Sequence, residues 1–215
     1  MSVKAPFLST VAAIALAVSG GVANATITTY SGVDDGAPVG GPFPLSDAAQ
    51  ASFLAAAGPV TTATFEGLPV GFYSPIAAAP GLSIALTGSD FGNGFSGVSN
   101  TTLGNLYGFN TTPGGGQFLG TSGDVTTLNS ATPTHAVGTF MTGLQTVFTA
   151  SLLITFTDTA PETLSVPIPV NGGAEYLGFT DTTAITNVTI TDNSTTNGTD
   201  AWGIGSSRRE QNKNT

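Results

Sequence analysis

Few residues in this chain could carry acid–base or nucleophilic chemistry. His135 is the only histidine, cysteine is absent, and only Glu66, Glu162 and Glu175 are glutamates before position 210. No serine occupies the G-x-S-x-G turn that exposes a nucleophilic serine in hydrolases. We therefore expect His135 to be a solvated histidine in a turn that leads into a strand, with no catalytic triad around it.

Paired carboxylates are the remaining route to hydrolysis. A glycosidase needs two carboxyl groups that face each other in a cleft, roughly 5 to 10 Å apart. Nothing in the sequence pattern brings two of the three glutamates together. A glycan-cleaving enzyme is thus a remote alternative, and we predict no catalytic residue and no enzyme activity.

Phosphate-binding chemistry is disfavoured for two reasons. The segment Gly92–Gly97 matches G-x-G-x-x-G, but that fingerprint binds a pyrophosphate only where a helix begins directly after it. Val98–Thr102 follows here and has no helical pattern. In addition, no Lys or Arg lies between Ala5 and Ser207, and nucleic-acid binding depends on such cations. We expect neither a nucleotide nor a nucleic acid as partner.

Calcium suits the acidic residues better than any transition metal, since oxygen ligands hold it and an exported acidic protein meets it readily. The sequence contains neither an EF-hand loop nor a calcium-binding nonapeptide repeat. A single Asp is more often a turn residue than a ligand. The Asp residues in loop-like contexts are Asp34, Asp35, Asp90, Asp124, Asp181, Asp192 and Asp200.

The two ends of the chain differ from its body. Residues 1–25 predict a cleaved signal peptide, because Lys4 precedes a short apolar run and Ala23-Asn-Ala25 fits the cleavage pattern. We expect the protein to be secreted, extracellular or periplasmic, and the mature chain to contain no transmembrane segment. At the other end, residues 206–215 are polar or charged, and we expect them to be a disordered tail.

The body, residues 26–205, has the composition of a single all-β domain. Charged residues are only 8% of the chain and hydrophobic residues 40%; β-branched threonine favours strands, and Gly and Pro mark turns. We predict an antiparallel β-sandwich of roughly eight to twelve short strands. The runs that read as strands are 26–30, 61–65, 82–87, 117–120, 136–141, 150–157, 164–170 and 184–191.

Some of these elements can be placed more closely. The run 150–157 is the most apolar and should be central, whereas 164–170 carries Pro167 and Pro169 and belongs at an edge. One short surface helix is expected at 46–57, with Ser46 as its N-cap and Gly58 as its stop. The predicted core is Phe65, Leu82, Ile84, Leu86, Phe140, Leu152, Ile154, Phe156, Val188, Ile190 and Trp202.

A long Gly-, Asn-, Ser- and Thr-rich segment, 88–116, separates two of the predicted strands. A loop of this length usually covers one end of a sandwich or builds a binding surface. Its aromatic side chains could seal the core or stack on a ligand, and the sequence favours the first role. They are Phe91, Phe95, Tyr107 and Phe109.

Six short segments resemble the bacterial exported proteins that carry a PEP-CTERM sorting signal. In that family the last segment continues into a short strand, a Pro-Glu-Pro motif, a membrane helix and basic residues. Here Gly205–Arg209 follows instead, so the resemblance implies that the anchor and the closing strand after Ile204 are missing. The resembling segments are Thr29–Gly32, Phe53–Ala57, Thr64–Pro69, Asn110–Gly115, Leu177–Phe179 and Asp200–Ile204.

The resemblance implies a jelly-roll-like sandwich and a non-enzymatic role at the cell surface or in the extracellular matrix, alongside exopolysaccharide. It also suggests a structural calcium ion held by Glu66 and Asp200, as in similar adhesive sandwich domains. The main alternative is a calcium-assisted carbohydrate-binding module in which Tyr73 or Tyr107 stacks on sugar rings. These two hypotheses stay open at the level of the sequence.

Overall fold

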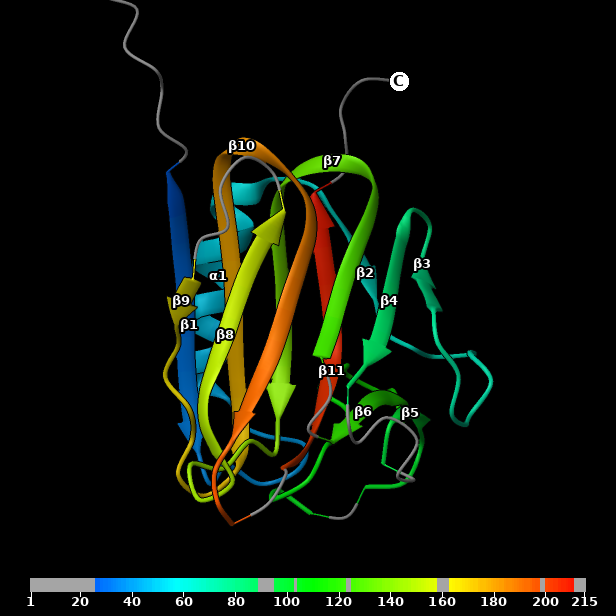
Figure 1. The fold of residues 1–215 in the computed structure, drawn as a ribbon, viewed down its shortest axis with the longest axis vertical. Helices are drawn as coiled ribbons and strands as arrows, with labels where there is room; N and C mark the ends of the chain where they lie inside the picture. The colour runs from blue at the N-terminus through cyan, green and yellow to red at the C-terminus, as the bar shows by residue number, and fades with distance from the viewer. Residues whose placement is uncertain are drawn as a thin grey trace, which may run out of the picture.

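The computed structural model describes residues 26–88, 95–102, 104–122, 125–157, 163–197 and 200–210. Every strand pairing among them is antiparallel, and one helix accompanies the strands (Figure 1). The predicted all-β fold is therefore confirmed. The elements are β1 (Ile27–Asp35), α1 (Pro44–Ala57), β2 (Val60–Ala63), β3 (Ile76–Ala79), β4 (Leu82–Thr87), β5 (Gly97–Ser99), β6 (Phe118–Ser122), β7 (Val125–Thr142), β8 (Thr149–Thr157), β9 (Thr163–Ser165), β10 (Gly173–Ser194) and β11 (Ala201–Glu210).

Two long strands, β7 and β10, bend over one end of the molecule and contribute to both layers (Figure 1). The second half of β7 and the first half of β10 pair with each other, between β11 and β1. Their other halves form the facing layer with β4 and β8. The register shifts in β10 between Thr180 and Asn187, where the strand turns from one layer to the other. The result is a β-sandwich, and its jelly-roll connectivity stays a prediction.

The main hydrophobic core fills the space between the two layers. It includes the side chains of β4, β8 and the second half of β10, which alternate between buried and half-buried along each strand. Such alternation is what one apolar face of a strand produces. All eleven residues predicted for the core are buried, although Phe140 packs under the helix and not between the layers.

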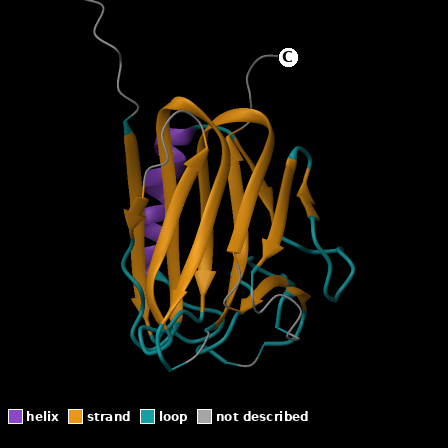
Figure 2. Ribbon diagram, in the orientation of Figure 1, coloured by secondary structure: helices purple, strands orange, loops and turns teal. Residues whose placement is uncertain are grey.

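Helix α1 covers the outer face of one layer (Figure 2). Two glycines that lie opposite each other on neighbouring strands, Gly138 of β7 and Gly178 of β10, make room for it. The buried ring of Phe53 packs over them. It lies so close that a β-carbon at Gly178 would be 2.7 Å from the ring, so a larger residue there would collide with it. Tyr176 packs against the Phe53 ring, and Phe140 packs in turn against Tyr176.

The helix begins two residues before the predicted start. Pro44 is its first residue, a position where proline is tolerated because the N–H it lacks would have no helical partner. Ser46 is therefore not the N-cap; it is buried, and its hydroxyl donates to the carbonyls of Gly32 and Ala174. The stop is as predicted, since the Gly58 N–H donates to Leu54 O with a positive φ of 73° at Gly58.

Two strand predictions need correction. β8 is not central, because the sheet order β5-β6-β11-β7-β10-β8-β9 places it next to the edge. The central strands are β7 and β10, whose length lets them pair on both sides. The predicted edge strand at 164–170 is indeed at the edge, but only β9 is a strand, and the chain leaves the sheet before Pro167.

The predicted disordered tail is wrong for its first five residues. β11 runs to Glu210 and pairs with β2 on one side and β7 on the other. Ser206 and Ser207 are buried, and the Thr139 hydroxyl donates to Ser206 O at 2.9 Å. Backbone pairing needs no apolar side chain, so a polar sequence closes the sheet here, and the strand after Ile204 is present. Residues 211–215 and the predicted signal peptide, 1–25, lie outside the described residues.

Candidate functional site

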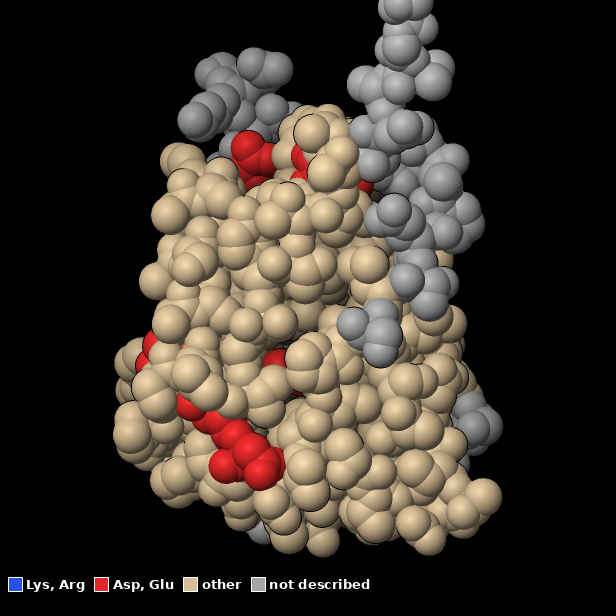
Figure 3. Space-filling view, turned by 90° about the vertical axis from the view of Figure 1, so that its left-hand side faces the viewer, with Lys and Arg blue, Asp and Glu red and all other residues tan. Residues whose placement is uncertain are grey.

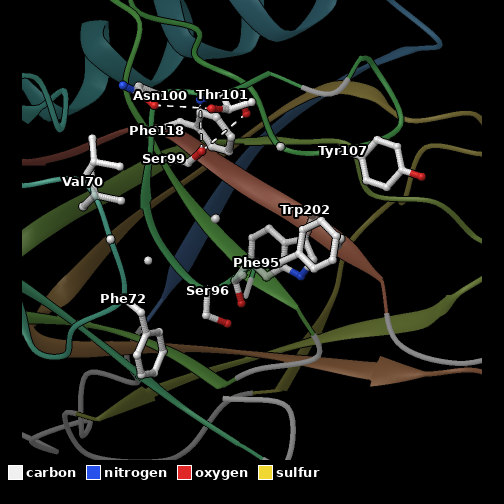
Figure 4. Close-up of a pocket in the computed structure, with 17 residues that line it drawn as sticks. Val70, Phe72, Phe95, Ser96, Ser99, Asn100, Thr101, Tyr107, Phe118 and Trp202 are labelled. Atoms are coloured by element: carbon white, nitrogen blue, oxygen red, sulfur yellow. Dashed lines mark hydrogen bonds between the residues drawn. The ribbon is translucent and has the colours of Figure 1, made fainter. Parts of the chain in front are cut away.

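A groove opens beside the short strands β5 and β6, at the end of the sandwich opposite the bends of β7 and β10 (Figures 1 and 4). Its volume is about 320 Å³. One rim carries Phe95 and Tyr107, which are 45% and 40% exposed, and the other carries Val70 and Phe72. Monomeric proteins seldom expose several large apolar side chains together unless the surface binds something.

The two aromatic rings of the first rim lie parallel. The ring planes of Phe95 and Tyr107 differ by 6°, and their centroids are 6.4 Å apart. A second hollow of about 380 Å³ also touches both rings and is lined by Asp200 and Gln145. The ring pair therefore stands between two hollows, with a surface that a flat apolar ligand face can contact.

The floor of the groove combines buried aromatic rings with polar groups. Phe118 and Trp202 are buried, and Ser99, Asn100 and Thr101 line one side (Figure 4). The indole N–H of Trp202 and the hydroxyl of Thr121, which also lines the groove, are buried and have no hydrogen-bond partner among the described residues. Buried polar groups are normally paired, so two unpaired groups in residues that line one groove are unusual.

The segment that holds Tyr107 is fixed by polar contacts from other elements. Gln145 Nε2 donates to Leu106 O at 2.9 Å, and the Gly173 N–H donates to Asn105 O at 2.8 Å. Gly143, with φ of 86°, packs against the backbone of Tyr107 so closely that a β-carbon there would collide with it. The position of the ring is therefore set by the folded framework.

Asp200 contributes to this framework. Its Oδ2 accepts the Gln145 N–H at 2.7 Å and the Thr149 hydroxyl at 3.3 Å. Asp192 lies nearby and is buried, and although the Thr149 hydroxyl is close enough to lower its pKa slightly, neither of its carboxyl oxygens has a well-formed hydrogen bond with a described residue. Burial raises the pKa of each carboxyl to about 6, and for Asp192 the charge of Asp200 adds to the effect. The two residues form a coupled acidic pair beneath the second hollow.

Glu66 lies elsewhere. Its Oε1 accepts the N–H groups of Gly116 and Gln117, just before β6 begins, at 2.8 and 2.7 Å. Asp200, by contrast, precedes Ala201, which pairs with Ser122 at the end of β6. The five residues of β6 separate the two carboxylates by roughly 16 Å. The structure does not bring Glu66 and Asp200 into one calcium site, and the described residues contain no cluster of three acidic or His side chains able to hold a metal.

The other predicted residues have different surroundings from those expected. Tyr73 is half-buried against the main core, its hydroxyl is buried, and it does not line the groove. His135 is exposed as expected, but it belongs to β7, where its Nδ1 lies 3.0 Å from Asp181 O. Glu175 is fully buried within β10. Asp192 is in a strand and not in a loop, whereas Asp90, Asp124 and Glu162 lie outside the described residues.

Sequence reasoning missed most of the groove. Of the residues that line it, the sequence indicates Tyr107, and less specifically Phe95, as ligand contacts, whereas Phe72, Phe118 and Trp202 come from three other segments. No spacing in the sequence links these segments, because β6 pairs on one side with β5, about twenty residues earlier, and on the other with β11, about eighty residues later. The one signal was the density of aromatic residues in a Gly-rich loop.

The surroundings of the site carry little charge. No Lys or Arg lines the groove or the second hollow in the described part of the chain. Figure 3 shows the left-hand side of the molecule in Figure 1 as mostly uncharged, with a few acidic groups at the top and in the lower half of the view. None of the helices in the described ranges is long and apolar enough to cross a membrane.

No protein-family model, curated protein or solved structure matches this chain. The conclusions about function consequently rest on the geometry of the groove and on the sequence.

Proposed function

We propose that this protein is an exported, non-enzymatic polysaccharide-binding protein of the cell surface or extracellular matrix, and that the groove binds a neutral glycan. The exposed, parallel rings of Phe95 and Tyr107 carry the proposal. Sugar rings present apolar C–H faces with hydroxyl groups at their edges. Such a ligand would stack on the rings while its hydroxyl groups meet the polar groups of the groove.

The chemistry of the lining favours a neutral sugar. Hydroxyl and amide groups from Ser99, Asn100 and Thr101 can donate to or accept from sugar hydroxyls. The unpartnered indole N–H of Trp202 is a further donor. A phosphate- or sulfate-rich ligand would find no cation in this groove to offset its charge. The signal-peptide pattern and the hydroxyl-rich surface support a role outside the cytoplasm.

Binding of immobilised polysaccharides by the mature protein tests the proposal. We expect saturable binding of a neutral polysaccharide, reduced about tenfold or more by Tyr107→Ala and by Phe95→Ala, because each removes one ring of the pair. Leu45→Ala is the matched control, since Leu45 is also a large exposed apolar residue but lies in α1. Equal binding by all four proteins would reject the groove as the site.

The same assay separates the alternative functions. A calcium-assisted module would lose binding in a chelator, whereas we expect no change, because Glu66 and Asp200 lie far apart. Release of reducing sugar ends from the polysaccharide would show an enzyme and overturn the proposal. Absence of saturable binding to every polysaccharide would leave a purely structural matrix protein.

A further inference from the structure

A second concave site lies on the side of the sandwich that carries the helix. Helix α1 packs on β1 and β10, and Thr62 of β2 and Ser206 and Arg208 of β11 line a hollow together with Asp47 and Gln50 of the helix. The segment 111–113 faces this opening from the other side. Together they enclose a small pocket of about 150 Å³, which shares no lining residue with the aromatic groove.

Arg208 of β11 lies in this pocket, where Thr62 of β2 and Gly138 of β7 are its strand partners. The residue is half-buried, and its buried Nε has no hydrogen-bond partner in the described part of the chain. Within the described residues no carboxylate forms an ion pair with its guanidinium. The nearby hydroxyl of Tyr176 cannot compensate the charge, because burial raises the pKa of Tyr176 and keeps the phenol neutral.

A guanidinium without an anion is costly in such a place. Removal of a charged group from water is unfavourable unless an opposite charge and hydrogen bonds replace the lost hydration. The effect is visible in Arg208, because burial lowers the pKa of its guanidinium. The pocket therefore contains a positively charged side chain, and no carboxylate of the described residues forms an ion pair with it.

The rest of the lining supplies hydrogen-bonding groups. Thr111 lines the pocket, and its buried hydroxyl has no hydrogen-bond partner among the residues that the structure describes. Thr62, Thr112 and Gln50 add further hydroxyl and amide groups. Arg208 and Thr111, from distant segments of the chain, thus line one cavity, and the Nε of the first and the Oγ1 of the second have no hydrogen-bond partner among the described residues. This indicates a site built for a small polar ligand.

A larger hollow of about 430 Å³ adjoins the pocket and shares Asp47, Thr111, Thr112 and Pro113 with it. Its wall includes the ring of Phe43 and the backbone of a Gly-rich segment. A ligand whose charged group occupied the small pocket could place a ring of carbon atoms in this hollow. Asp47 lies where the two spaces meet, so a ligand with several negative charges would be repelled.

We propose that the pocket binds the carboxylate of an acidic sugar, with the carboxylate on Arg208 and the sugar ring in the adjoining hollow. The planar guanidinium matches a carboxylate through two parallel hydrogen bonds. One cation, a neighbouring Asp47 and a chain with a net charge of −9 favour a monovalent carboxylate over a divalent phosphate. The site would let the protein hold acidic sugar units independently of the aromatic groove.

Isothermal titration of the mature protein with sodium glucuronate at fixed ionic strength tests this site. Glucose and inorganic phosphate are the comparison ligands, and free acetate distinguishes a bare carboxylate from a carboxylated sugar. We expect saturable binding of glucuronate, weaker binding of acetate by at least tenfold, and none of glucose or phosphate in this pocket. Tyr107→Ala should leave glucuronate binding unchanged, so that this site and the groove fail or succeed separately.

Three variants test the role of the pocket. Arg208→Gln should reduce the affinity for glucuronate tenfold or more, whereas Arg209→Gln should not. Arg209 is the matched control because its guanidinium is already bound to Ser130, Thr132 and Pro80 O. Asp47→Asn should strengthen binding severalfold by removal of the neighbouring negative charge.

Some outcomes would overturn the proposal even if Arg208→Gln folds poorly. Thr112→Phe, which narrows the entrance and keeps Arg208, should also abolish glucuronate binding, and retention of full affinity would place the ligand elsewhere. Equal affinity for phosphate and glucuronate would reject the choice of a carboxylate. Failure of the unaltered protein to bind glucuronate at millimolar concentration would reject the site itself.

Discussion

The carboxylate of Asp34, at the end of β1, accepts hydrogen bonds from the N–H groups of Leu45 and Ser46 in the first turn of α1, at 3.0 and 2.8 Å. The residue that precedes the helix, Phe43, offers no capping side chain. Asp34, a strand residue more than ten positions before these N–H groups, therefore caps the N-terminus of the helix. The same contact fixes the helix against the sheet, since the Ser46 hydroxyl also bonds to Gly32 O.

We expect Asp34→Ala to lower the free energy of unfolding by about 2 kcal/mol, because it leaves two helix N–H groups without a partner and removes a charge that favours the helix N-terminus. Urea denaturation followed by circular dichroism would measure the change. Asp47→Asn is the control: Asp47 is in the same turn but exposed, so its replacement should cost only a few tenths of that value. Equal effects would contradict a capping role for Asp34.

The Asp192–Asp200 pair predicts an unusual dependence of stability on pH. Both carboxyls have folded-state pKa values of about 6, above the ordinary value of 3.8. The folded protein therefore binds more protons than the unfolded chain between these values, and its stability should fall as the pH rises from about 4 to about 6. The expected loss is on the order of 2 kcal/mol, most of it complete by pH 7.

Asp192→Asn should flatten this dependence and be at least as stable as the unaltered protein at pH 7. Asp35→Asn should behave in the opposite way. Hydrogen bonds from Asn171 lower the pKa of Asp35, so its charge stabilises the folded state at neutral pH. Chemical denaturation at pH 4.5 and pH 7 would compare the three proteins, and identical slopes in all of them would rule out the coupled pair as the cause.

Glu175 predicts a stabilising substitution. Its side chain is fully buried, neither carboxyl oxygen has a hydrogen-bond partner within the described ranges, and burial raises its pKa well above the ordinary value. Glu175→Met keeps the shape of the side chain and removes the buried polar group, and we expect the free energy of unfolding at pH 7 to rise by about 1–3 kcal/mol. Thermal unfolding measures the change. A clear loss of stability would indicate that the carboxyl has a ligand or partner that matters.

The sequence predicted the core better than the sites, for physical reasons. Burial follows from apolar alternation within a strand, so Ile154 and Val188 could be recognised locally. The bends of β7 and β10 could not be recognised from the local sequence, because they follow from pairing between distant strands. The polar residues after Gly205 suggested a tail, although backbone hydrogen bonds close a sheet whatever the side chains. Because residues 206–215 were expected to be a disordered tail, the sequence did not indicate that Arg208 lines a pocket.

Gln145 provides a test of how the aromatic groove is held together. Its side-chain amide donates to Leu106 O but does not line the groove that Phe95 and Tyr107 border. We expect Gln145→Ala to weaken binding of the neutral polysaccharide severalfold through a less ordered Tyr107, with saturation still reached at higher ligand concentration. Unchanged affinity would show that the Gly143 and Gly173 contacts suffice to position the ring.

Truncation of the C-terminus distinguishes the paired end of β11 from the residues after it. A protein that ends at Gly205 loses the pairing of Ser207–Glu210 with β2 and of Ser206–Arg209 with β7, and with it the hydrogen bond from Thr139 to Ser206. We expect its melting temperature to fall by roughly ten degrees or more, since several kcal/mol of backbone pairing and side-chain contacts disappear. A protein that ends at Glu210 is the control and should melt like the full chain, because the last five residues are polar and contribute no apolar side chain to the core. If both truncated proteins melted like the full chain, the end of β11 would not contribute to the stability of the sheet.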